Sequence, residues 1–127
     1  MKQNFAFKPP HGSFSTGEIS IVQKLYEFYR DLHQAVLLFP KVDKHTLGQL
    51  LLTKSLQLIE TILYSSRLQQ SAKKEHLLQA NASLDLLKLL IRLSNETKAV
   101  SPKKYVLLEG YLQEVGKMLG GWIRSLS

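Results

Sequence analysis

The chain has 127 residues, of which 44% are hydrophobic, and it carries a formal net charge of +7. This length is typical of one domain with its own core, and the composition excludes a disordered or fibrous chain. The sequence contains no cysteine, which excludes disulfides and thiolate metal sites and fits a reducing compartment.

The hydropathy pattern predicts a soluble protein of the cytoplasm. The longest stretches without a charged residue, such as residues 32–40, are nine residues long. A membrane-spanning helix needs about 20 apolar residues. The N-terminus also lacks the apolar centre of a secretory signal peptide. We therefore expect no contact with a membrane.

Residues 1–14 differ from the rest of the chain. Two prolines and a glycine break any helical pattern there, while three phenylalanines make the segment too apolar for a purely solvated tail: Phe5, Phe7 and Phe14. We expect an N-terminal arm that docks on its own subunit or on a neighbour, with a frayed terminus as the alternative. Residues 15–127 are expected to form the folded domain.

Two helices are predicted between residues 15 and 66. The first begins at a capping box of Ser15 and Glu18 and ends before Pro40. The second begins with Asp43 as its N-cap and fades at residues 65–66. Its apolar residues form two adjacent stripes, which are Leu47, Leu51, Leu58 and Ile62, and Leu52, Leu56, Ile59 and Leu63. Together they cover roughly 180° of the helix, which is wide for one packing partner.

The third predicted helix runs from about Ser71 to Asn95 and is apolar on two opposite faces. One face contains Leu77, Ala80, Leu84, Leu87 and Ile91, and the other contains Leu78, Ala82, Leu86, Leu89 and Leu93. The fourth helix begins with Ser101 as its N-cap and Pro102 at its first position. Apolar residues then recur at steps of three and four as far as Trp122.

Four helices with short connections predict an all-α, antiparallel up-down four-helix bundle. A bundle core does not use two opposite stripes of one helix. Either the extra leucines contact other subunits, or one helix is central within the monomer. We favour a homo-oligomer, since large apolar patches seldom stay exposed. The expected interface residues on these helices are Leu52, Leu56, Leu78, Leu86 and Leu89.

Four glycines interrupt the fourth helix, around the sequence EVGKMLGGWIRSL, although each costs about 1 kcal/mol relative to alanine. Gly116 and Gly120 are four residues apart, at the edge of the apolar stripe. We predict that they let a helix of another subunit approach closely, and a phosphate backbone is the rival partner. Gly110 and Gly121 lie on the outer side, and the sequence pattern does not explain them.

No pattern for catalysis or metal binding stands out. Di-metal bundles use Glu-x-x-His pairs, and none of the four histidines follows a glutamate by three residues. His33 lies on the apolar side of its helix, where a hydrogen-bonded, packed histidine is favoured over a ligand. Phosphate-binding glycine loops are also missing. We therefore expect no catalytic residue, no metal, no cofactor and no small-molecule substrate.

The positive charge is concentrated in the second half of the chain. From Tyr64 onward there are ten lysines and arginines but five aspartates and glutamates. Such an excess favours a polyanionic partner, and solvated surface charges are the alternative. Lysines in the first turns of two helices oppose the helix dipole, which weakens a purely structural interpretation. The candidate nucleic-acid-binding residues are Lys73, Lys74, Lys88, Arg92, Lys98, Lys103, Lys104, Lys117 and Arg124.

These cations are expected to form more than one patch. In an antiparallel bundle, Lys73 and Lys74 lie at the end opposite Lys103 and Lys104. An oligomer would repeat each patch around its axis, which favours salt-sensitive binding to phosphates with weak sequence specificity.

Two stretches of the chain are similar to a known family. The segment YRDLHQAVLLFPKVDKHTLGQLLLTKSLQLIETIL and the closing EVGKMLGGWI resemble the accessory variability proteins, Avd, of diversity-generating retroelements. The most specific parts are FPK followed by HTLGQ, and GKMLGGWI near the C-terminus. The resemblance covers roughly Tyr26 to Ile123. Ribosomal-intervening-sequence four-helix proteins are the second candidate, but a segment typical of them between the helices does not occur here.

The resemblance implies a small four-helix bundle that assembles into a pentameric barrel with a basic surface. Avd-like proteins associate with the reverse transcriptase of the element and with its template RNA, and DNA is a further possible ligand. They are needed for mutagenic copying and are not themselves catalytic. The alternative is a structural or protein-interaction oligomer of the ribosomal-intervening-sequence type, without a retroelement role.

Overall fold

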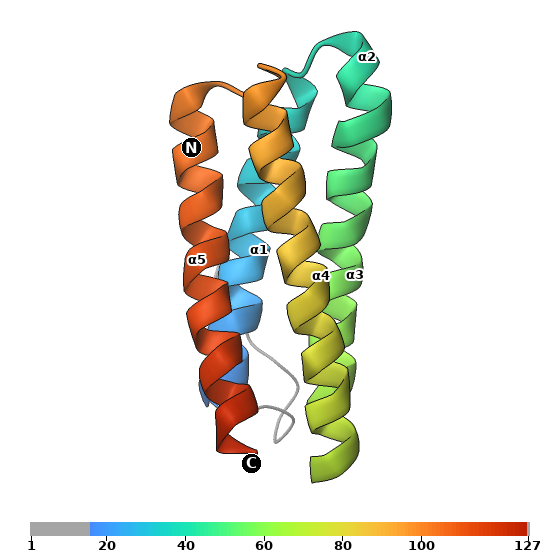
Figure 1. The fold of residues 1–127 in the computed structure, drawn as a ribbon, viewed down its shortest axis with the longest axis vertical. Coiled ribbons are helices and arrows are strands. Elements are labelled where there is room, and N and C mark those ends of the chain that lie inside the picture. Colours follow the sequence, from blue (N-terminus) through green and yellow to red (C-terminus); the bar gives the residue numbers. More distant parts are fainter. Residues whose placement is uncertain (1–15, 127) are drawn as a thin grey trace, which may run out of the picture.

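The computed structural model describes residues 16–126 as four long helices joined by short connections (Figure 1). The arm of residues 1–14 and the Ser15 half of the capping box lie outside the described residues. No strand occurs within residues 16–126. The helical elements are α1 (Thr16–Leu37), α2 (Lys41–Asp43), the π-helical turn η1 (Lys44–Gly48), α3 (Gln49–Ser65), α4 (Gln70–Glu96) and α5 (Pro102–Ser125).

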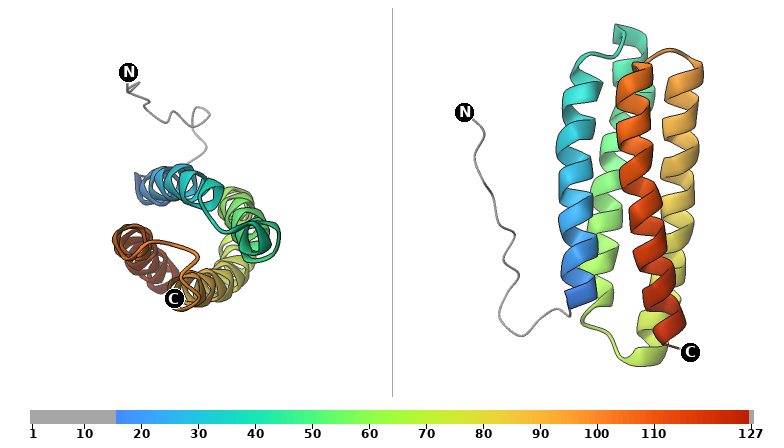
Figure 2. Two further views of the ribbon diagram at one scale, coloured as in Figure 1. Left: turned by 90° about the horizontal axis from the view of Figure 1, so that it is seen from above. Right: turned by 90° about the vertical axis from the view of Figure 1, so that its left-hand side faces the viewer.

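The four long helices run alternately up and down (Figures 1 and 2), which confirms the predicted antiparallel bundle. Each packs on two neighbours, in the order α1, α3, α4, α5 and back to α1. Two connections therefore share one end of the bundle, residues 38–48 and 97–101, and we call it the double-connection end. The other end carries the connection of residues 66–69.

The core is built from all four helices and is almost entirely aliphatic. The predicted core face of α4, from Leu77 to Ile91, is buried, and so is the stripe of Leu51, Leu58 and Ile62 on α3. Three serines are fully buried as well, but each hydroxyl donates to a carbonyl one turn earlier, Ser55 to Leu51 at 2.7 Å, Ser65 to Thr61 at 2.6 Å and Ser94 to Leu90 at 2.9 Å. This removes the cost of burying a polar group.

The start of the second helix differs from the prediction. Pro40 occupies the N-cap position with φ −53° and ψ 148°, and the backbone N–H groups of Asp43 and Lys44 both donate to its carbonyl at 2.9 Å. Asp43 thus lies inside the first turn and makes no capping hydrogen bond, so the prediction of Asp43 as N-cap was wrong. The fixed φ of proline is compatible with the start of a helix, so the helix begins directly after Pro40, before Asp43.

The start of the fourth helix agrees with the prediction. Ser101 is extended, with φ −69° and ψ 152°, and its Oγ accepts a hydrogen bond of 3.2 Å from the N–H of Lys104. Pro102 follows as the first helical residue, where its missing N–H costs nothing.

Two glycines illustrate how differently the bundle constrains its helices. A Cβ on Gly48 would lie 2.8 Å from Val36 Cγ1 and 3.3 Å from the Asp43 carbonyl oxygen, whereas nothing lies within 4 Å of a Cβ on Gly110. Val36 is buried and β-branched, so it has little freedom to move aside.

We expect Gly48→Ala to lower the free energy of unfolding by about 1–3 kcal/mol, because the added methyl group overpacks the junction with α1. Gly110→Ala is the matched control and should raise the free energy of unfolding by about 1 kcal/mol, since alanine favours the helix. Urea denaturation of both variants at one protein concentration tests this. Equal effects of the two substitutions would contradict the account.

Candidate nucleic-acid interface and assembly faces

The candidate nucleic-acid-binding residues fall into three groups along the bundle. Lys73 and Lys74 lie near the N-terminus of α4, at the end that carries residues 66–69. Lys98, Lys103 and Lys104 lie at the double-connection end, so the fold places the two groups at opposite ends. The remaining candidates lie along the two helices α4 and α5: Lys88, Arg92, Lys117 and Arg124.

The cations in the middle of α4 are surrounded by carboxylates. Lys88 and Arg92 line a groove between α4 and α5, of about 240 Å³, together with Asp85 and Glu109. The same groove holds Tyr105, whose pKa is raised, chiefly because its hydroxyl hydrogen-bonds the Glu109 carboxylate. Two cations beside two carboxylates make this groove close to neutral. It is a weaker polyanion site than the sequence pattern indicated.

The fold adds cations that the sequence analysis did not include. Lys41 belongs to α2 and Lys44 begins η1, and both lie at the double-connection end with Lys98, Lys103 and Lys104. From the sequence we expected the excess of positive charge mostly in the second half of the chain. The predicted topology could have indicated these two lysines, because the first and third connections of an up-down bundle lie at the same end.

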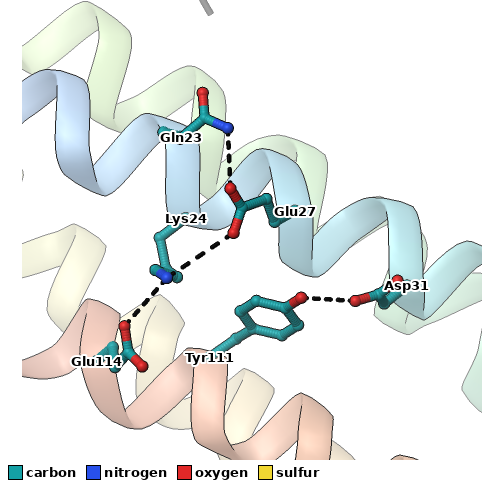
Figure 3. A network of polar contacts seen from close by, with 6 residues as sticks. All are labelled: Gln23, Lys24, Glu27, Asp31, Tyr111 and Glu114. Atoms are coloured by element: carbon teal, nitrogen blue, oxygen red, sulfur yellow. Dashed lines mark hydrogen bonds and ion pairs between the residues drawn. The ribbon is translucent and has the colours of Figure 1, made fainter. Parts of the chain in front are cut away.

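The seam between α1 and α5 is acidic and internally paired (Figure 3). Lys24 Nζ lies 3.8 Å from Glu27 Oε1 and 3.1 Å from Glu114 Oε2, and 5.7 Å from the centre of the Tyr111 ring. The Tyr111 hydroxyl donates a 2.6 Å hydrogen bond to Asp31 Oδ2. Three carboxylates against one lysine make this seam unsuited to phosphates, and its contacts join α1 to α5.

We expect Tyr111→Phe to lower the free energy of unfolding by about 1–2 kcal/mol, because Asp31 loses a charge-assisted hydrogen bond. Burial and the Asp31 carboxylate raise the pKa of Tyr111 to about 12, above its usual value of about 10. A raised folded-state pKa gives a stabilisation that is complete below pH 10 and is lost as pH rises toward 12. The stability difference between the two proteins should shrink above pH 10. A difference that stays constant between pH 8 and pH 11 would contradict this assignment.

The second apolar face of α4 lies on the surface of the subunit. Leu78 and Leu89 are 50% and 58% exposed, Leu93 and Ala82 are also exposed, and Leu86 is half-buried. The alternative in which α4 is central within the monomer is therefore wrong. We call this row of residues 78, 82, 86, 89 and 93 the α4 stripe.

A second apolar surface lies between α1 and α3. It is a groove of about 480 Å³, lined by Tyr26, Tyr29, Arg30, His33, Gln34, Leu56 and Ile59. Leu52 is half-buried on the same side of α3 and packs against the core. We call this surface the α1–α3 groove, and it holds the predicted interface residue Leu56.

His33 does not have the environment that the sequence analysis favoured. It is exposed at the rim of the α1–α3 groove, with its ring 6.2 Å from that of Tyr29, so the prediction of a packed histidine was wrong. The core side of α1 is set by Phe28 and Leu32, and His33 lies beside it. Within residues 16–126, no group of three histidine, aspartate or glutamate side chains is placed to hold a metal ion.

The glycines of α5 lie in two environments. A Cβ on Gly116 would lie 3.2 Å from Lys88 Nζ and 3.6 Å from Leu84 Cδ2, so Gly116 faces α4 of its own chain. A Cβ on Gly120 would lie 3.4 Å from Arg124, and one on Gly121 would lie 3.8 Å from the same guanidinium. A methyl group at Gly116 would make an ordinary contact with Leu84, and only the flexible end of Lys88 would have to move, so packing against α4 does not require a glycine there. The role of Gly116 at a subunit interface, and that of Gly120, stay predictions.

The features above define a class of protein: a four-helix bundle with basic ends, an acidic seam and two apolar faces on its surface. Among the described helices, none is long and apolar enough to cross a membrane. A family model described as bAvd-like matches residues 19–126. The chain belongs to the bAvd-like family, as the sequence resemblance indicated. A comparison with curated proteins finds no match.

Proposed function

We propose that this chain is a non-catalytic accessory protein of a diversity-generating retroelement. It acts in the cytoplasm, where it binds the reverse transcriptase of the element and the template RNA during mutagenic copying. The observation that carries this proposal is the family match over residues 19–126, which spans almost all of α1 and the whole of α3, α4 and α5.

The charge distribution supports binding to nucleic acid. The net charge is +7, and lysines are concentrated at the ends of the bundle, away from the carboxylates of the α1–α5 seam. Lysine contacts to phosphates release counterions and carry little sequence information, so binding should weaken steeply with salt. The protein would thus hold template RNA for the enzyme without reading its sequence.

The apolar surfaces support a homo-oligomer, for which the family resemblance suggests a pentamer. The α4 stripe is an exposed row of residues on α4, whereas the α1–α3 groove is a concavity formed by two other helices of the same subunit. A stripe that packs into the groove of the next copy makes a head-to-tail contact, which closes into a ring when the rotation permits. Each basic end would then be repeated around the ring axis.

Binding of a structured RNA across a salt series tests the nucleic-acid role. We expect binding at about 50 mM salt, with an affinity that falls by orders of magnitude at about 200 mM. Absence of binding at the lower concentration would contradict the proposal. It would favour a structural four-helix oligomer of the ribosomal-intervening-sequence type, which needs no RNA.

A further inference from the structure

We propose that the phosphodiester backbone of nucleic acid binds at the double-connection end of the bundle. The inference rests on the proposed function, because it assigns the nucleic-acid role to one of the two basic ends. The site consists of lysines from the two connections and from the start of α5: Lys41, Lys44, Lys98, Lys103 and Lys104.

The first reason is the local balance of charge. Residues 38–48 and 95–106 together hold these five lysines but only two carboxylates, Asp43 and Glu96. Lys41, Lys98 and Lys103 are exposed. By contrast, Lys24 lies between two glutamates on the α1–α5 seam, and Lys88 shares its groove with Asp85 and Glu109. The double-connection end thus concentrates cations with few acidic neighbours, and its positive potential is correspondingly strong.

The second reason is the backbone conformation of Lys98, which lies two residues after the end of α4. Its φ is +61°, and it is the one non-glycine residue with positive φ among the residues described. The N–H of Lys98 donates to the Asn95 carbonyl at 3.1 Å and the N–H of Ala99 donates to the Ser94 carbonyl at 2.9 Å. This hydrogen-bonding pattern is the Schellman motif, whose left-handed position usually holds glycine.

Lysine is therefore present where glycine is the less strained residue. Strain of this kind is commonly found at functional sites, where the side chain has a role that the backbone position does not require. The Lys98 side chain is exposed and lies among the lysines of the double-connection end, so its charge is the property that distinguishes it from glycine.

The third reason is the position of Lys103 and Lys104 in the first turn of α5. The N-terminus of a helix carries a partial positive charge, so these two lysines are repelled by their own helix, although the Lys104 N–H is already bonded to Ser101 Oγ. A phosphate near this turn would interact favourably with both lysines and with the helix N-terminus. A bound anion would thus offset the repulsion between the two lysines and the positive N-terminus of α5.

The double-connection end also exposes aliphatic side chains, which favour a protein as the alternative partner. Leu38 and Val42 are 82% and 73% exposed in the first connection. They would suit a protein partner with an apolar, acidic surface. The five lysines outnumber the nearby carboxylates, and the strained residue is itself a lysine, so we assign the end to nucleic acid and treat a protein partner as an outcome of the test.

Two full-length variants that remove equal charge from the two ends test the assignment. One replaces Lys41, Lys98, Lys103 and Lys104 with glutamine, and the matched control replaces Arg67, Lys73, Lys74 and Arg124 with glutamine. Circular dichroism checks that both fold. Fluorescence anisotropy then measures binding of a labelled RNA hairpin, and of DNA of the same sequence, across a salt series.

We expect the first variant to lose at least about tenfold in affinity at low salt, with a salt slope reduced by about one for each phosphate contact removed. The control lowers the net charge equally, so it should also weaken binding, but by a factor several-fold smaller than that of the first variant. An equal or larger loss in the control would overturn the assignment. So would unchanged RNA binding in the first variant together with lost binding to the reverse transcriptase, which would assign the end to a protein. If the unsubstituted chain binds no nucleic acid, the proposed function fails as well.

Lys98→Gly separates the charge of this residue from its backbone strain. We expect a higher urea midpoint, because glycine adopts positive φ freely, together with weaker RNA binding. A higher midpoint with unchanged RNA affinity would show that Lys98 does not contact the nucleic acid, which contradicts the second reason above.

Discussion

Replacing both Leu78 and Leu89 with glutamate should convert the proposed oligomer into folded monomers of 14.5 kDa. Both side chains are at least half exposed on the α4 stripe, so the substitution leaves the core of the subunit intact. In the assembly, however, two carboxylates would be buried against the apolar α1–α3 groove of the next copy. The groove offers one arginine, Arg30, so at least one of the two carboxylates would be buried without a partner, which costs several kcal/mol at each interface and is enough to abolish a contact of ordinary size.

Light scattering measures the mass, and circular dichroism reports whether the helices persist. The control is the double substitution of Val106 and Leu107 with glutamate, two exposed apolar residues on α5 outside both proposed faces. It should leave the mass of the assembly unchanged. A mass of one subunit for the unsubstituted chain, or an intact assembly after substitution of the α4 stripe, would contradict the head-to-tail arrangement.

Phe28→Ala should destabilise the subunit by about 3–5 kcal/mol, the largest effect expected from one core substitution. Phe28 is fully buried in α1, and its ring packs edge-on against Tyr111 of α5, with 6.3 Å between the ring centres. The substitution removes this contact and leaves a cavity between two helices of the bundle. A typical domain is stable by about 5–15 kcal/mol, so much of the total would be lost.

Urea denaturation compares this variant with Tyr29→Ala, the neighbouring aromatic residue on the same helix. Tyr29 is half-buried at the α1–α3 groove, so its replacement should cost clearly less. Equal destabilisation by the two substitutions would show that the structure assigns the wrong face of α1 to the core.

The sequence predicted the bundle and the double-faced α4 because leucine periodicity reports directly on burial. Leu77, Leu84 and Leu87 recur at helical steps and are buried, while the opposite row from Leu78 to Leu93 repeats the same steps on the surface. Periodicity shows that a face is apolar but not what covers it. The structure of one subunit leaves the α4 stripe exposed, and the partner of the stripe stays a prediction.

Other features depend on three-dimensional relations that one-dimensional patterns do not contain. The grouping of Lys41 and Lys44 with Lys98 follows from the antiparallel topology, although the residues are more than fifty positions apart. The start of the second helix was mispredicted because Asp43 is a good N-cap in isolation, whereas Pro40 fixes an earlier turn. Lys98 was predicted as a candidate cation, but its positive φ was not, since lysine rarely adopts that backbone conformation.

Co-purification with the reverse transcriptase of the proposed retroelement tests the central claim most directly. The two proteins are co-expressed, one carries an affinity tag, and size-exclusion chromatography with light scattering measures the mass of what elutes. The account predicts a single complex that contains the enzyme and several copies of this chain, and that retains the template RNA at low salt. Elution of the enzyme alone, with this chain in a separate peak, would contradict it.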